Sequence, residues 1–254
     1  MTADTLVILT GASRGLGRAL AAQYLADGAF VLGLARREAV ELQAAGAGGL
    51  EQWPVDLADP LPVAERLGAW LVDFELRAAG RLPARVRVIH NAAMISEPGD
   101  VATSAPDDLA RSLRIGLEAP VALTAAFLRA TAHWAASDRR VLFVSSGLGR
   151  RPMAGAAAYC AQKAGLDHFA RALALEEGAR AHGARVASVA PGIIDTDMQK
   201  QLRGADPGRF AAQGTFAGFH ASGALDSPVT AAAKMIALLE RADYGADPVA
   251  DVRG

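Results

Sequence analysis

Short apolar runs alternate with helical segments along the chain, and this alternation constrains the fold more than any other feature. The runs are too apolar to have one face in water, so they predict strands of a parallel sheet covered on both faces. The expected strands are 5–10, 29–35, 50–55, 85–90, 140–145, 184–190 and 248–252. The expected helices are 14–27, 37–45, 62–78, 107–134, 155–182 and 227–241. This order favours a doubly wound α/β fold with a mainly parallel, seven-stranded sheet and helices on both faces.

No linker, repeat or shift in composition divides the chain, so a single domain over residues 1–254 is expected. Residues 195–225 are expected to form one long irregular stretch, rich in glycine and phenylalanine. Irregular segments of that length are usually functional. This stretch is therefore predicted to be a lid over the substrate.

Composition excludes several classes of protein. The net charge of −1 gives no electrostatic reason to expect a nucleic acid or a membrane surface as partner. No apolar run approaches the roughly 18 residues of a membrane-spanning helix, and residues 1–5 predict no signal peptide. Cys160 is the single cysteine, so no internal disulfide is possible and a cytoplasmic location is expected. The five histidines lack the spacing of metal ligands, so no metal site is expected.

A glycine-rich turn joins the first expected strand to the first helix, with the sequence Thr10-Gly11-Ala12-Ser13-Arg14-Gly15-Leu16-Gly17. Glycines let the backbone approach a ligand, and the helix N-terminus offers free N–H groups and a positive dipole to a pyrophosphate. An NAD site would carry an acid about 20 residues past the glycines, but the second strand leads into Arg36 instead. Arg14 and Arg36 suit a 2′-phosphate, which favours NADP(H). A structural turn and solvated arginines are the alternatives.

Tyr159 and Lys163 lie four residues apart at the start of an expected helix, so they share one face. A nearby ammonium stabilises a phenolate, and we expect it to lower the tyrosine pKa and create a general acid or base. Ser145 and Ser146 end the fifth strand, at the sheet edge that also holds the glycine turn. A serine hydroxyl there can hold a carbonyl oxygen beside the tyrosine. A chance surface pair is the alternative.

Gly11-Ala12-Ser13-Arg14-Gly15 also satisfies the Gly-x-Ser-x-Gly pattern of a hydrolase nucleophile. A serine hydrolase that uses Ser13 is therefore a remote alternative. Its catalytic histidine would have to come later in the chain, where nothing singles out the last histidine, His220. No earlier strand is present to supply the second oxyanion donor.

Taken together, these segments resemble the classical short-chain dehydrogenase/reductase family over about residues 6–252. The further matching segments are Val55-Asp56-Leu57, His90-Asn91-Ala92-Ala93, Val144-Ser145-Ser146 and Pro191-Gly192-Ile193-Ile194-Asp195-Thr196. The resemblance implies a Rossmann fold and an NADP(H)-dependent enzyme that acts on C=O or CH–OH groups. It also suggests a homodimer or homotetramer formed through the two long helices.

The resemblance also implies a role for each site residue. Ser146 and Tyr159 would polarise and protonate the substrate carbonyl while NADPH delivers hydride, and Lys163 would bond the nicotinamide ribose. Asp56 would bond the adenine, and Asn91 would steady the central strand near the ribose. The cofactor-binding residues implied are Gly11, Ser13, Arg14, Gly15, Leu16, Gly17, Arg36, Asp56, Leu57, Asn91, Ala92, Tyr159, Lys163, Pro191, Gly192, Ile194 and Thr196.

A narrower resemblance points to the branch of sepiapterin and benzil reductases. It rests on residues 191–199, on Leu117-Glu118-Ala119-Pro120 and on Asp251-Val252-Arg253. The branch implies an α-dicarbonyl substrate, either a benzil-like diketone or a pterin side chain. Asp251 would anchor a pterin, unless it merely ends a strand. The candidate substrate contacts are Leu148, Ile193, Phe210, Phe216, Phe219 and Asp251.

One position departs from the family pattern. Many members carry an asparagine on the first long helix, where it supports a water-mediated proton relay, but Gly116 stands at the matching position. No neighbouring asparagine can replace it, because Asn91 is the single asparagine of the chain. We expect an altered relay. A non-catalytic NADP(H)-binding regulator on the same fold is the alternative function.

Overall fold

The strands form one parallel sheet in the computed structural model, which describes residues 3–43, 48–79 and 81–253. The strand order is β3-β2-β1-β4-β5-β6-β7, and each neighbouring pair is parallel. The order reverses between β1 and β4, the kind of switch point at which α/β sheets bind ligands. The strands are β1 Thr5–Thr10, β2 Phe30–Ala35, β3 Gly49–Pro54, β4 Arg85–His90, β5 Asp138–Val144, β6 Arg185–Ala190 and β7 Val249–Asp251. The predicted doubly wound fold is confirmed.

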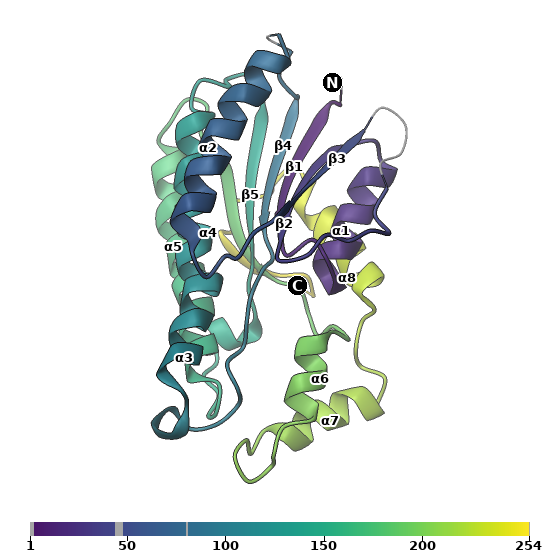
Figure 1. The fold of residues 1–254 in the computed structure, drawn as a ribbon, viewed down its shortest axis with the longest axis vertical. Coiled ribbons are helices and arrows are strands. Elements are labelled where there is room, and N and C mark those ends of the chain that lie inside the picture. The colour runs from purple at the N-terminus through teal and green to yellow at the C-terminus, as the bar shows by residue number, and fades with distance from the viewer. Residues whose placement is uncertain (1–2, 44–47, 80, 254) are drawn as a thin grey trace.

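Helices cover both faces of the sheet (Figure 1). One face carries α1 (Gly15–Ala26) and α8 (Pro228–Leu239), and the other carries α2 (Pro60–Arg77), α4 (Ala119–Ala130) and α5 (Ala157–Gly178). Successive residues of β1 pack alternately into the two hydrophobic cores, one on each face of the sheet. Leu6 and Ile8 pack on one side and Val7 and Leu9 on the other, which is why this strand is apolar throughout.

Two expected helices are wrong in part. Residues 37–43 form bends and a turn instead of a helix, and residues 44–45 lie outside the described residues. The Gln52 side chain accepts from the Ala39 N–H at 2.8 Å and donates to the Ala39 carbonyl, so a side chain of β3 takes the bonds a helix would need. The expected helix 107–134 is α3 (Pro106–Leu113), a π-helical turn over Arg114–Glu118, and α4.

The segment 195–225 is more ordered than the sequence predicts. It contains α6 (Asp197–Arg203) and α7 (Gln213–Ala221), which lie beyond the carboxyl end of the sheet (Figure 1). Phe210 lies between them and is fully buried, so an apolar anchor holds a stretch that its glycines made look irregular. No helix of the described residues is both long enough and apolar enough to cross a bilayer.

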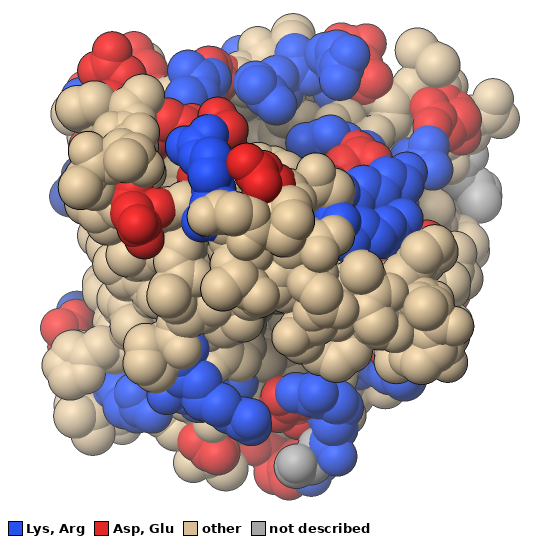
Figure 2. All heavy atoms as spheres, turned by 90° about the horizontal axis from the view of Figure 1, so that it is seen from below, with Lys and Arg blue, Asp and Glu red and all other residues tan. Residues whose placement is uncertain are grey.

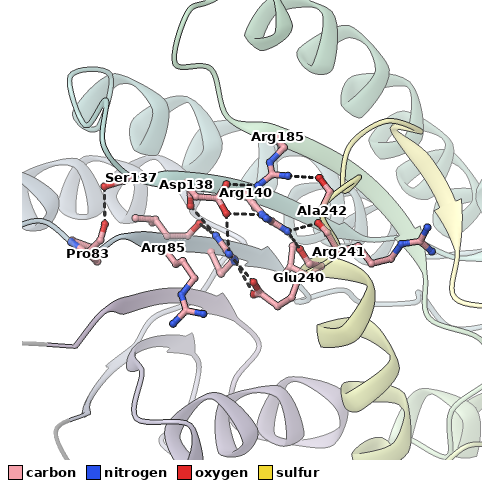
Figure 3. Close-up of polar contacts among 12 residues, drawn as sticks. Pro83, Arg85, Ser137, Asp138, Arg140, Arg185, Glu240, Arg241 and Ala242 are labelled. Atoms are coloured by element: carbon pink, nitrogen blue, oxygen red, sulfur yellow. Dashed lines mark hydrogen bonds and ion pairs between the residues drawn. The ribbon is translucent and has the colours of Figure 1, made fainter.

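A polar network ties the amino-terminal ends of β4, β5 and β6 to the C-terminal end of α8 (Figure 3). The buried guanidinium of Arg87 donates to both carboxylate oxygens of Glu240 at 2.8 and 2.7 Å and to Asp138 at 3.1 Å. Arg140 and Arg185 also donate to Asp138, at 2.9 and 2.7 Å. Burial would raise the pKa of Glu240, but the bonds from Arg87 hold it below its usual value. The network therefore joins β4, β5, β6 and the end of α8 through charged hydrogen bonds.

Candidate active site

The glycine turn is closely packed against the end of β4. Gly11 and Gly15 have φ values of +73° and +52°, which favour glycine. A Cβ at Gly17 would overlap the carbonyl oxygen of Gly11. Asn91 donates from its side chain to the carbonyl of Thr10 at 3.1 Å, and the Thr10 hydroxyl accepts from the Asn91 N–H at the same distance. Asn91 thus fastens the turn to the central strand.

The amino-terminal end of α1 can accept an anion. Arg14 is its N-cap residue, and no side chain caps the helix. The first-turn N–H groups therefore suit a pyrophosphate. Gly15 lies against Thr196, whose Cγ2 would be 3.6 Å from a Cβ at that position. These features fit a dinucleotide that passes between the glycine turn and the segment after β6.

Two arginines flank this end of the sheet. Arg14 donates to Asp197 at 2.7 Å, and Arg36 is exposed just after β2. Asp56 accepts from the Ala58 N–H at 3.0 Å and from Arg111 at 2.6 Å. The backbone bond first, then Arg111 and Arg36, keep the pKa of Asp56 below its usual value. Arg36 is thus near the carboxylate that the family resemblance assigns to the adenine.

The segment after β6 begins with Pro191 and Gly192, and Gly192 has a φ of +83°. Ile193 and Ile194 are held against the start of α8 by backbone bonds, because Asp226 donates to the Ile193 carbonyl at 2.9 Å. Sequence-predicted cofactor residues of β1, β4 and β6 are thereby brought to one edge of the sheet. Leu57 follows β3 and packs in the core.

Ser146, Tyr159 and Lys163 meet at the carboxyl end of β5. Lys163 is almost fully buried and donates from Nζ to the Val144 carbonyl at 2.7 Å. Its Nζ lies 5.5 Å from the centre of the Tyr159 ring. Ser146 is near enough to Tyr159 to stabilise its phenolate by hydrogen bonding. The structure therefore brings together the three residues predicted to be catalytic.

Burial decides the proton affinities of this group. It raises the pKa of Tyr159 to about 12, and the hydrogen bond from Ser146 only opposes the shift. Burial also lowers the pKa of Lys163 to about 8, against the attraction of Asp167. The expectation that Lys163 would lower the tyrosine pKa is wrong, because burial is the largest cause of the shift and Lys163 is not among the groups that act on it. At neutral pH the tyrosine keeps its proton, as a proton donor must.

Sequence reasoning missed Asp167, which is buried one helical turn beyond Lys163. It accepts from Ser145 Oγ at 2.5 Å and from Ser188 Oγ at 2.7 Å. Ser145 thus bonds to Asp167 of α5, whereas Ser146 lies beside the Tyr159 hydroxyl. The spacing of Tyr159, Lys163 and Asp167 by four residues was the available signal, because it places all three on one face of α5.

Sequence reasoning also missed Gln162, the residue before Lys163, which is fully buried. Its side-chain amide donates to the Met94 carbonyl at 2.9 Å and to Ser112 Oγ at 2.8 Å. Nothing in the linear sequence pairs Gln162 with those residues. The only sequence feature that pointed to Gln162 was the glycine at position 116, whose missing side chain leaves a space to be filled.

An apolar cluster covers Tyr159. Ile95, Leu202 and Phe210 are buried in it, and Leu148, Met198 and Phe216 pack against it. Of the candidate substrate contacts, Leu148 and Phe216 therefore reach this cluster at its edge, while Phe210 is fully buried within it. Phe219 contacts Phe216 edge-on, with ring centres 6.0 Å apart. Ile193 is not part of this cluster of described residues.

Asp251 lies in a polar cavity beside the serine turn. Arg253 donates to both its carboxylate oxygens at 2.8 and 2.7 Å. Gly147, Arg150 and Arg151 complete the wall of this open cavity of about 480 Å³. On the face of the molecule seen from below in Figure 1, basic side chains gather in separate patches with tan surface between them (Figure 2). The two bonds from Arg253 thus leave neither carboxylate oxygen of Asp251 unpaired.

Comparisons with known proteins agree with this geometry. The model of the short chain dehydrogenase family matches residues 5–207. A benzil reductase ((S)-benzoin forming) of Bacillus cereus is 30% identical, over 94% of this chain and 95% of the relative. A sepiapterin reductase of Mus musculus is 33% identical, over 92% and 91% of the two chains. The expected branch is confirmed.

Among solved structures, one from Beutenbergia cavernae described as an NAD(P)-dependent gluconate 5-dehydrogenase with bound NADP has a TM-score of 0.77. It is 26% identical, and the match covers 98% of this chain and 95% of that one. The match to the family model and the relatives named reductases show that the chain is an oxidoreductase acting on carbonyl or hydroxyl groups. They decide against the serine hydrolase and the non-catalytic regulator.

Proposed function

Because the chain belongs to the short-chain dehydrogenase family, we propose that it is an NADPH-dependent carbonyl reductase. It reduces one ketone of an α-dicarbonyl compound to an alcohol. Ser146 polarises the carbonyl oxygen, and Tyr159 donates the proton. The bound nicotinamide supplies the hydride.

The convergence of Ser146, Tyr159 and Lys163 beneath an apolar cluster supports this proposal most directly. A pKa of about 12 keeps the Tyr159 hydroxyl protonated until the reduced carbonyl oxygen takes its proton. A lysine with a pKa of about 8 can then return a proton to the phenolate near neutral pH. Both values suit the direction of reduction.

NADP(H) is preferred to NAD(H) in this proposal. Arg14 and Arg36 flank the predicted ribose position, and Arg36 lies near Asp56. A 2′-phosphate would form charge-assisted bonds with both arginines, and it would compete with Asp197 for Arg14. The Beutenbergia cavernae protein with bound NADP is consistent with this choice.

A benzil-like diketone fits the substrate side better than a pterin. Tyr159 lies in an apolar cluster with Leu148 and Phe216 at its edge, which suits an aryl group. A pterin would have to displace Arg253 from Asp251 before that carboxylate could bind it. We therefore place a benzil-like compound first and a pterin side chain second.

Three wider features belong to the same proposal. The segment 195–225, with α6 and α7, acts as the substrate lid, and the enzyme works in the cytoplasm. The chain forms a homodimer or homotetramer through the two long helices. The apolar residues Leu113, Leu117 and Val121 of the first of these helices line an open groove beside Leu61 of α2, and this exposed apolar surface supports such contact. Light scattering of the purified protein tests the oligomeric state.

The experiment that tests the function follows NADPH consumption with benzil, a mixed aryl-alkyl diketone, sepiapterin and a simple aldehyde, each repeated with NADH. We expect turnover of the diketones with NADPH. Tyr159→Phe should lower turnover by about 10²- to 10⁴-fold and keep NADPH binding. A fully active Tyr159→Phe variant would overturn the catalytic role, and equal turnover with NADH would overturn the cofactor choice.

A further inference from the structure

Gly116 and Gln162 share one space. Gly116 lies in the π-helical turn Arg114–Glu118, and Gln162 lies on α5 directly before Lys163. A Cβ at Gly116 would overlap Oε1 and Cδ of Gln162, well inside the 3.0 Å that real Cβ atoms keep from other atoms. The glutamine amide therefore occupies the place that a side chain at position 116 would take.

The amide of Gln162 joins three elements. Its Nε2 donates to the Met94 carbonyl and to Ser112 Oγ, and Ser112 Oγ itself donates to the Met94 carbonyl at 2.8 Å. Met94 lies in the segment after β4, three residues beyond Asn91, and Ser112 lies at the end of α3. Gln162 thus links the segment after β4, the end of α3 and the helix of Tyr159 and Lys163.

The oxygen of the same amide is unsatisfied. Gln162 is fully buried, and its Oε1 has no hydrogen-bond partner among the described residues. A buried acceptor without a partner costs about 1–3 kcal/mol. A hydrophobic side chain would avoid that cost, whereas a carbonyl oxygen can accept from a water molecule. π-helical turns of this kind also occur frequently at functional sites.

We propose that Gln162 is a positioning residue for Tyr159 and Lys163, in place of the polar side chain that Gly116 lacks. Its Nε2 fixes the Met94 carbonyl and the end of α3 relative to the helix that carries Tyr159 and Lys163. Its amide fills the space beside Gly116, so the π-helical turn packs directly against it. This proposal rests on the proposed reductase function.

The test removes the amide and then rebuilds it from the other helix. Gln162→Ala should lower kcat for diketone reduction roughly 10- to 100-fold, with KM for NADPH within about twofold of the parent, because Gln162 is not among the residues assigned to the cofactor. The double variant Gly116→Asn with Gln162→Ser places an amide in the same space from position 116. We expect it to recover kcat to within about threefold.

Gln52→Ala is the matched control. Gln52 also bonds main chain through its amide, but it lies in the edge strand β3, far from Tyr159 in the sheet order. Its kcat at saturating NADPH should be unchanged. Full kcat in Gln162→Ala would overturn the proposal. So would a folded double variant, judged by its circular dichroism and NADPH binding, that stays as slow as Gln162→Ala.

If Gln162→Ala does not fold, the double variant alone decides the matter. Its kcat must then match the parent enzyme for the proposal to stand. Failure of the reductase function itself is recognised separately, because in that case the parent enzyme and Gln52→Ala would also lack turnover of every carbonyl tested.

Discussion

Replacing Gly116 by alanine tests the packing of the site most sharply. In an ordinary helix this change stabilises by about 1 kcal/mol. Here the new methyl group would overlap Oε1 of Gln162, so the glutamine must move. It would then lose its bonds to the Met94 carbonyl and Ser112 Oγ, each worth about 1 kcal/mol, and the crowding adds a further 1–3 kcal/mol.

We therefore expect Gly116→Ala to lower the free energy of unfolding by roughly 2–4 kcal/mol, measured by urea denaturation with circular dichroism. In the Gln162→Ala background the same change should be neutral or stabilising. The coupling energy of this double-mutant cycle should thus be at least about 2 kcal/mol. Additive effects, or a Gly116→Ala protein as stable as the parent, would refute the reasoning that the two residues share one space.

Four further outcomes are expected. Tyr159→Phe should lower kcat by about 10²- to 10⁴-fold with NADPH affinity retained in a fluorescence titration; retained turnover would contradict this. Arg36→Ala should weaken NADPH roughly 10- to 100-fold, since a charge-assisted bond is worth about 1.5–3 kcal/mol, and hardly affect NADH; equal losses in the two titrations would contradict it. Reduction should slow as the pH rises through about 8, where Lys163 loses its proton, and a pH-rate profile flat to pH 10 or so would contradict this. The pKa of Glu240 is held low in the folded state, so its bonds to Arg87 stabilise the fold above the unfolded pKa, and this stability is lost as the pH falls through the folded pKa. Glu240→Gln should lower the free energy of unfolding by about 2–3 kcal/mol at neutral pH, measured by urea denaturation. It should also flatten the dependence of stability on acid pH.

The fold could be predicted from the sequence because its signals are local. The apolar runs of β1 and β2 and the glycines of the first turn each report on their own surroundings. The expected helix was wrong over residues 37–43 because its competitor, the Gln52 side chain, comes from another strand. The order within 195–225 was missed because Phe210 is an anchor only once it is buried.

The site could be predicted in its residues but not in its energetics. Tyr159, Lys163 and Ser146 stand in recognisable segments, and they do meet in space. The direction of the tyrosine pKa shift depends on burial, which the spacing does not contain. The Gln162 amide fills the space beside Gly116 only because two helices pack together there. The sequence alone shows a glycine at position 116 but not what fills that space.

Steady-state consumption of NADPH with benzil, measured for the parent enzyme and Tyr159→Phe, tests the central claim most directly. The account predicts stoichiometric formation of benzoin by the parent enzyme, faster with NADPH than with NADH, and loss of turnover in a variant that still binds NADPH. Benzoin formation that is undiminished in Tyr159→Phe would contradict the assignment of the proton donor. A parent enzyme that binds NADPH but reduces no dicarbonyl would contradict the proposed substrate class.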